Sequence, residues 1–180
     1  MSEYKMGYID IYKSGAGEFM GGALITDRLG IPIEFRHTEP VSPTKVQQIL
    51  YGRALEKFVK TETLAKCLLG DLKNKPDLLV VADADYYPLT RMFNFPFVQL
   101  GKAAREPMEK HGDYAEVSES EIHLQALSHR EPLRVRVDRK NAPTMPAIKS
   151  ILTDVTRTMD VLEPLSRVQE ALKALVAEKI

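Results

Sequence analysis

The chain has 180 residues, with 25 basic and 25 acidic side chains, so its formal net charge is zero. A protein that held duplex DNA mainly through its phosphates would show a clear basic excess, so nucleic acid is an improbable main partner. A single cysteine, Cys67, excludes an intramolecular disulfide and a zinc knuckle. No apolar stretch approaches the roughly 20 residues of a membrane span, so we expect a cytoplasmic protein without membrane contact.

The first forty residues predict three strands. Apolar and polar residues alternate over 7–13, with Ile9 and Ile11 on one face and Asp10 on the other. A second strand over 19–26 leads into a turn in which Gly30 suits the left-handed position that closes a short hairpin, and a third strand follows over 31–38. Pairing about this turn sets Leu24 opposite Ile33 and Gly22 opposite Phe35.

Helical segments and a buried strand follow. Ser42 as N-cap and Pro43 at the first helical position indicate a helix start. Its apolar positions recur at helical spacing: Val46, Ile49, Leu50, Leu55, Phe58 and Val59. A second helical stretch precedes Pro76, and the strand 78–82 is apolar on both faces, which is typical of a central strand covered on both sides.

The remaining chain predicts an edge strand near Pro96, a hairpin and two terminal helices. Centring a turn on 129–132 matches both faces of the hairpin 121–140 in one register. That register pairs Ala126 with Val135, Leu124 with Val137, Gln125 with Arg136, His123 with Asp138 and Glu121 with Lys140. Apolar stripes after Pro146 and after Pro164 predict the two C-terminal helices.

This order of elements predicts an α/β (α+β) fold. We expect a single mixed, largely antiparallel sheet with helices packed on it and two C-terminal helices. No linker rich in Pro, Gly or Ser divides the sequence, so residues 1–180 are predicted to form a single globular domain.

The first half of the chain resembles the opening of a ribonuclease H-like fold: three antiparallel strands, a helical segment and then a buried strand. The resemblance implies two divalent metals held between carboxylates on the first strand, the first helix and the fourth strand. Asp10, Glu56, Asp83 and Asp85 occupy suitable places in that order. This alternative interpretation is a divalent-metal-dependent nuclease or phosphoesterase.

A simpler interpretation of Asp83 and Asp85 is that they mark the end of a buried strand, since aspartate favours turns. The sequence contains no HExxH, GxGxxG, GxxxxGK[ST] or GxSxG motif. On these grounds the main prediction contains no catalytic residue, no metal and no cofactor.

Aromatic residues crowd into the segment that follows Asp85. We predict that they form a contact surface for a protein partner or for a second copy of the chain: Tyr86, Tyr87, Phe93, Phe95 and Phe97. A basic stripe of Arg130, Arg134, Arg136 and Arg139 leaves RNA binding open, but interspersed acids favour a salt-bridged sheet face. The main prediction is therefore a non-catalytic binding or assembly module, a complex subunit acting through protein–protein contacts.

Overall fold

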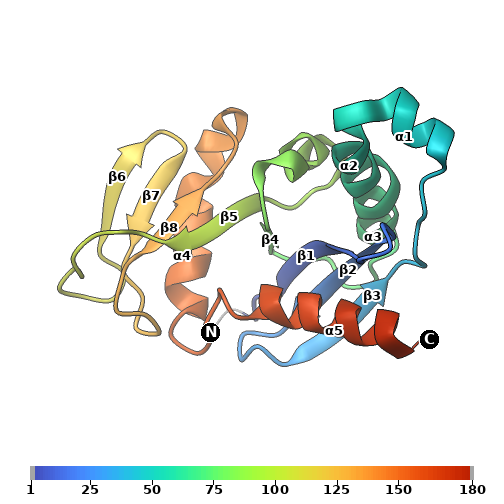
Figure 1. Cartoon of the computed structure of the whole chain (residues 1–180). Coiled ribbons are helices and arrows are strands. Elements are labelled where there is room, and N and C mark those ends of the chain that lie inside the picture. Colours follow the sequence, from blue (N-terminus) through green and yellow to red (C-terminus); the bar gives the residue numbers. More distant parts are fainter. Residues whose placement is uncertain (1–2, 179–180) are drawn as a thin grey trace.

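A computed structural model describes residues 3–178. In this part of the chain, eight strands form one mixed sheet in the order β3-β2-β1-β4-β5-β8-β7-β6 (Figure 1). The strands are β1 (Met6–Lys13), β2 (Phe19–Thr26), β3 (Pro32–His37), β4 (Leu78–Val81), β5 (Phe97–Lys102), β6 (Tyr114–Ser118), β7 (Glu121–Leu124) and β8 (Leu133–Arg136). The pairs β1–β4 and β4–β5 are parallel and the others antiparallel, so the predicted class of a mixed, largely antiparallel sheet is confirmed.

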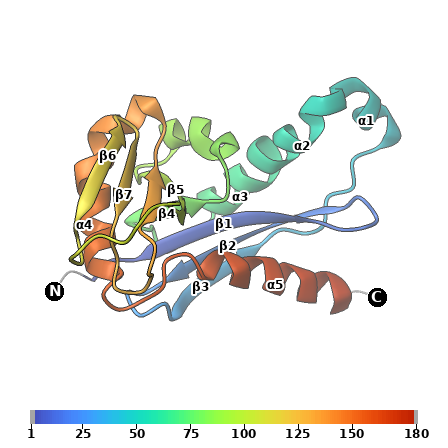
Figure 2. The ribbon, with the colours of Figure 1, turned by 60° about the vertical axis from the view of Figure 1, so that its left-hand side comes forward.

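Helices cover both faces of the sheet. The segment between β3 and β4 comprises α1 (Lys45–Tyr51), the 3₁₀ turn η1 (Gly52–Ala54), α2 (Leu55–Phe58), the π-helix η2 (Val59–Ala65) and α3 (Lys66–Gly70). After β4 comes the 3₁₀ segment η3 (Ala84–Met92), and after β8 come η4 (Arg139–Thr144), α4 (Met145–Val155) and α5 (Pro164–Glu178). Figure 2 shows α2, α3 and η3 on one side of the central strands and α5 on the other. The two C-terminal helices are confirmed.

The two faces bury separate cores because successive side chains of a strand point to opposite sides. On one face, Tyr8, Leu24 and Val80 pack with residues of α4 and α5. On the other, Ile9 and Leu79 pack with α3 and η3. The strand β4 is buried on both faces, as its continuous apolar sequence predicts.

The first hairpin forms around the predicted turn but in a different register. Gly30 has a φ of 80°, and Asp27 Oδ1 accepts hydrogen bonds from the backbone of Leu29 and Ile31. However, Leu24 pairs with Phe35, not Ile33, because a register shift follows Ile25. The predicted pairing of Gly22 with Phe35 is therefore wrong, and Gly22 pairs with His37. The side chains of α5 approach Gly22 instead, and a Cβ there would lie 3.1 Å from Leu172 Cδ2.

The second hairpin is also present in a different register. Glu121 pairs with Arg136 and Leu124 with Leu133, so the predicted partners His123–Asp138 and Glu121–Lys140 are wrong. The turn is wider than expected because the side chain of Gln125 donates to the carbonyls of Ala126 and His129 and accepts from Met108 N. These bonds stabilise a long loop in place of the predicted four-residue turn.

Two further local predictions are wrong. The first helix is capped by Thr44, not Ser42, through a capping box with Gln47. The strand near Pro96 is not an edge strand, because β5 lies between β4 and β8. Proline is compatible with this position since Pro96 precedes the strand and its carbonyl accepts from Leu79 N at 2.9 Å.

Candidate functional site

The candidate site lies where the parallel strands β1 and β4 diverge. Their last paired residues are Ile9 and Val81, and β4 ends there while β1 continues to Lys13. Asp10 is therefore the first residue of β1 past the paired region, and Asp83 follows the end of β4. Open sheets of parallel strands bind ligands beyond the carboxyl ends of their strands, and this edge is of that kind.

Asp83 and Asp85 are held together by the start of η3. Asp83 caps this segment, and its Oδ1 accepts a hydrogen bond of 2.9 Å from Asp85 N. The other oxygen, Oδ2, takes no part in this capping bond. Both side chains remain about two-fifths exposed, at 42% and 41%. The prediction that these residues mark the strand exit describes the backbone, but their oxygens also share a charged partner.

That partner is Lys60, whose Nζ lies 2.8 Å from Asp83 Oδ2 and 3.0 Å from Asp85 Oδ2. Only 11% of the lysine side chain is exposed, and the ammonium also lies 5.5 Å from the ring centre of Tyr86. Burial acts to lower the pKa of Lys60, but the bonds to Asp83 and Asp85 outweigh it and raise that pKa. The lysine is therefore held in its charged form.

The π-helix η2 positions Lys60. Its wider turn changes the face on which the following residues lie, and π-turns often occur at functional sites. Both Lys60 and Thr61 are buried there, and Thr61 Oγ1 donates to Lys57 O at 2.8 Å. The four residues between Val59 and Leu64 are all polar, so nothing in the sequence distinguishes Lys60 as an inward-facing charge. The sequence interpretation missed it.

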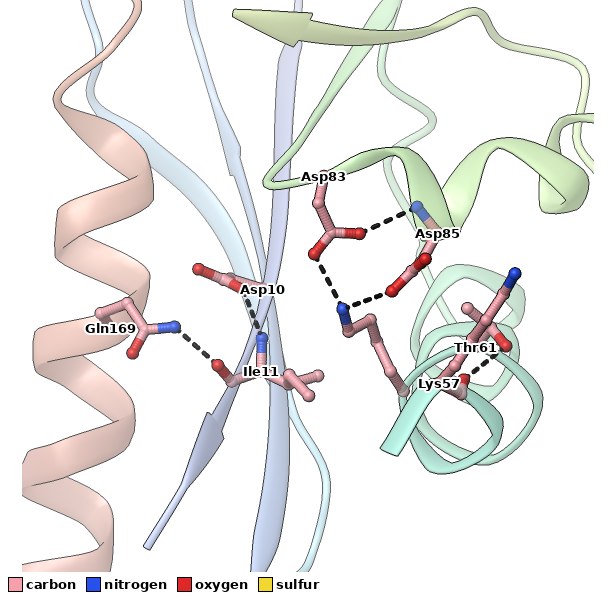
Figure 3. Close-up of polar contacts among 8 residues, drawn as sticks. Asp10, Ile11, Lys57, Thr61, Asp83, Asp85 and Gln169 are labelled. Atoms are coloured by element: carbon pink, nitrogen blue, oxygen red, sulfur yellow. Dashed lines mark hydrogen bonds and ion pairs between the residues drawn. The ribbon is translucent and has the colours of Figure 1, made fainter. Parts of the chain in front are cut away.

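Asp10 reaches the same edge from the face covered by α5. Its Oδ1 accepts a hydrogen bond of 2.8 Å from Ile11 N, and Gln169 of α5 donates to Ile11 O at 2.6 Å. Figure 3 shows Asp10 between Gln169 and Asp83. Burial raises the pKa of Asp10; Gln169 and the Ile11 amide act to lower it, and the charge of Asp83 adds to the rise.

Tyr86 completes the candidate site. Its side chain is fully buried, and its hydroxyl has no hydrogen-bond partner within residues 3–178. Burial raises the pKa of Tyr86, and the charges of Asp10, Asp83 and Asp85 raise it further. Tyr86 therefore contributes a neutral, buried hydroxyl within the electrostatic reach of the three carboxylates.

Glu56, the predicted helix carboxylate, is not part of this arrangement. Its side chain is 58% exposed and lies 3.8 Å from Lys13 Nζ. The residue that the helical segment does bring to Asp83 and Asp85 is Lys60. The order of elements in the sequence correctly indicated that the helical segment contributes a side chain to this site, but it did not identify that side chain as Lys60.

Most of the aromatic segment forms core. Tyr86, Phe95 and Phe97 are buried, and Tyr87 and Phe93 are half-buried against the same cluster. The three phenylalanine rings stack in sequence beneath η3. Tyr86, Phe95 and Phe97 are not available to a partner in this conformation, because η3 lies over the sheet and β5 enters its interior, whereas Tyr87 and Phe93 stay partly exposed.

Carboxylate oxygens suit a hard divalent cation, but their arrangement here does not fit one. Among the described residues, no group of three acidic, histidine or cysteine side chains is placed to hold a metal ion. Asp10 faces α5, and the ammonium of Lys60 lies between the other two carboxylates. In this conformation one ammonium of the chain itself offsets part of the negative charge of the two carboxylates.

Comparison with known proteins supports the fold. The sequence matches no protein-family model and no curated protein. The structure of human ENDOV is similar with a TM-score of 0.55 and 12% identity, over 98% of this chain and 86% of that protein. The catalytic domain of human Endonuclease V is similar with a TM-score of 0.54 and 13% identity, over 99% of this chain and 84% of that protein. A Ciona intestinalis Endonuclease V in complex with a 24mer DNA has a TM-score of 0.44 and 10% identity, over 80% of this chain and 76% of that protein.

The chain thus shares its overall fold with the solved structures of human Endonuclease V. This finding corrects three predictions: a non-catalytic module acting through protein contacts, a complex subunit, and nucleic acid as an improbable partner. Zero net charge averages over the whole surface, so it does not exclude a local nucleic-acid-binding surface. No helix in the described part of the chain is long and apolar enough to cross a membrane.

Proposed function

We propose that this protein is a nuclease, and that it acts on nucleic acid at the edge formed by Asp10, Asp83 and Asp85. The observation that supports the proposal best is the meeting of these carboxylates beyond the last paired residues of β1 and β4, in a fold shared with an endonuclease. Asp10 and Asp83 are close enough for the charge of one to raise the pKa of the other.

The chain's own residues give this edge a defined chemistry. Carboxylates can orient a water molecule and accept its proton during attack on a phosphodiester. Their negative charge also repels the phosphate, so a positive charge is needed beside them. Lys60 supplies that charge in the described conformation, and Tyr86 supplies an unpaired hydroxyl.

Exposed basic residues near this edge can contact the phosphates of a bound strand. Lys13 ends the strand that carries Asp10, and Arg53 and Lys57 lie in the helical segment that carries Lys60. Contacts of this kind give affinity that falls as salt concentration rises. The proposed partner is therefore a nucleic acid held through its backbone.

The test is a cleavage assay on labelled single- and double-stranded DNA and RNA with Mg²⁺ or Mn²⁺. We expect cleavage by the wild type or by Lys60→Gln, and a loss of about 100-fold or more in Asp10→Asn and in Asp83→Asn. Asp71→Asn is the matched control, because Asp71 is an exposed carboxylate at the end of α3. If neither the wild type nor Lys60→Gln cleaves any of the four substrates, the proposal is rejected.

We also propose a cytoplasmic location. The sequence has one cysteine, which is free and exposed, as expected for a reducing compartment. Fractionation of cells that express the tagged protein would test this, and recovery in a membrane or secreted fraction would contradict it.

A further inference from the structure

The helix α1 carries an apolar stripe that no other described part of the chain covers. Val46, Ile49 and Leu50 recur at helical spacing, and Ile49 and Leu50, at 71% and 76%, are the most exposed large apolar residues of the described chain. Every residue from 44 to 54 is exposed. Figure 1 and Figure 2 both show α1 at one extremity of the molecule. The stripe is therefore open to a partner.

This helix has well-formed ends but no packing. A capping box of Thr44 and Gln47 begins it and Gly52, with a φ of 51°, ends it, yet none of its seven residues is buried. Helices in proteins gain most of their stability from the packing of an apolar face, and isolated ones shorter than about 12 residues are marginal. With the rings of Tyr51 and Phe58, the stripe leaves on the order of 500 Å² of apolar surface exposed, a size at which surface patches often mark contact sites.

The opposite end of the sheet has an apolar cleft with an acidic rim. The cleft lies between the edge strand β6 and α4 and has a volume of about 320 Å³. Ile122 and Met145, which are both buried, line its inner part. Glu116 and Glu119 line it at the surface, and neither has an ion pair within residues 3–178. The lining has one basic residue, Lys149, whose ammonium lies 3.6 Å from the centre of a tyrosine ring of β6.

The stripe and the cleft lie in segments of opposite charge. Residues 44–55, which contain α1, include Lys45 and Arg53 and no acidic residue, and neither of these two side chains has an ion pair in the described chain. Residues 106–121, which contain β6, include six acidic residues and one basic residue. The whole chain has no net charge, so charge is separated between these two segments. Patches of opposite charge attract and orient two molecules over a distance of roughly 10 Å at moderate salt.

We propose that α1 of one molecule docks in the cleft between β6 and α4 of a second copy. Figure 1 shows α1 and β6 at opposite ends of the molecule, so one chain cannot cover its own stripe. A symmetric, antiparallel contact of α1 with α1 would place Lys45 opposite Arg53, where like charges repel. The head-to-tail contact instead brings aliphatic side chains to an apolar cleft and Lys45 to its acidic rim. Contacts of this kind extend into rings or open chains.

The contact area indicates a weak association that depends on concentration. About 500 Å² of apolar surface per molecule is less than the roughly 800 Å² per partner of a standard stable interface. We therefore expect a Kd on the order of 10–100 μM, and weaker binding at high salt because part of the attraction is electrostatic. The contact does not include Asp10, Asp83 or Asp85, so it goes beyond the proposed nuclease activity and is independent of it.

Sedimentation velocity tests the proposal over protein concentrations of about 5 to 500 μM. The wild type should sediment faster as concentration rises and shift toward the monomer in about 0.5 M NaCl. Leu50→Asp places a charge in the stripe, and the double variant Glu116→Lys/Glu119→Lys reverses the charge of the rim; each should associate about tenfold or more weakly. Leu127→Asp is the matched control, because Leu127 is 69% exposed on the loop between β7 and β8, and it should behave as the wild type.

A mixture of the two defective proteins distinguishes a head-to-tail contact from a symmetric one. Leu50→Asp keeps an intact cleft, and Glu116→Lys/Glu119→Lys keeps an intact α1. An equimolar mixture should therefore form dimers and no larger species. A wild type that stays monomeric at the highest concentration, association that survives either change, or a mixture that stays monomeric would each overturn the proposal.

A second measurement uses the wild type alone, in case the variants do not fold. Unlabelled and isotopically labelled protein are mixed and treated with a carbodiimide, which joins an amine directly to a carboxylate. Mass spectrometry should detect cross-links between the two isotopic forms that join Lys45 to Glu116 or Glu119, because these groups meet in the contact. Association without such cross-links would contradict the proposal. Binding of nucleic acid or anionic lipid vesicles that depends on Leu50, by a protein that stays monomeric, would assign the stripe to that ligand and also overturn it.

Discussion

The bridge between Lys60 and Asp83 should make a measurable contribution to stability. Its ammonium is nearly buried, whereas the carboxylate is two-fifths exposed. Exposed pairs contribute about 0–1 kcal/mol, and removal of one partner from a fully buried pair costs about 3–5 kcal/mol. A half-exposed bridge should fall between these limits, and we expect a coupling energy of about 1–2 kcal/mol.

A double-mutant cycle with Lys60→Met and Asp83→Asn measures this coupling. Methionine keeps the apolar stem of the lysine, and asparagine keeps the oxygen that accepts from Asp85 N, so each change removes mainly a charge. Urea denaturation followed by circular dichroism gives the free energy of unfolding of the four proteins. Each single variant should be destabilised, and the double variant should lose less than the sum of the two.

The exposed pair Lys66–Glu62 provides the comparison. Both residues lie in the adjoining helical turns, and their side chains are 35% and 44% exposed. The corresponding cycle with Lys66→Met and Glu62→Gln should give about 0.5 kcal/mol or less. A Lys60–Asp83 coupling no larger than this control would refute the argument that burial strengthens the bridge.

Two further predictions concern the sheet. Burial acts to raise the pKa of Glu34, but hydrogen bonds from Arg36 and from the 73–74 turn outweigh it and lower that pKa to about 2. The ionised carboxylate therefore stabilises the folded state above about pH 4.5, and this contribution is lost as pH falls toward 2. Glu34→Gln should cost about 1–2 kcal/mol at pH 7 and flatten the acid side of the stability curve; an unchanged acid midpoint would contradict this. Gly7→Ala should cost about 1–3 kcal/mol in a denaturation assay, because its Cβ would lie 2.8 Å from the Pro76 ring, whereas Gly15→Ala, with nothing within 4 Å, should change little. Equal effects of the two alanines would contradict the packing argument.

Local chemistry in the sequence was enough to predict several elements. The turn at Gly30 formed because a glycine tolerates a positive φ there, and β4 was recognised from apolar residues on both faces. The terminal helices followed from apolar stripes such as that of Val168 and Leu172. Each of these signals depends on residues that are close together in the sequence.

Strand register was decided by tertiary structure. The second hairpin differs from the predicted register by an even number of residues, so Leu124 and Val135 stay on the buried face in both. Alternation identifies faces but cannot distinguish registers that differ by two or four residues. The wide loop that Gln125 stabilises sets the register in which Leu124 pairs with Leu133.

The candidate site, too, was predictable from the sequence only in part. The sequence placed Asp10 and Asp83 on strands of the right kind, but whether those strands become parallel neighbours depends on the packing of the whole sheet. Lys60 could not be selected from helical periodicity, because the π-turn of η2 breaks the 3.6-residue spacing on which that periodicity rests. The sequence by itself therefore determined which segments carry the charged groups. Only the tertiary structure decided that a lysine, and not Glu56, meets the two aspartates, since that contact joins residues more than twenty positions apart.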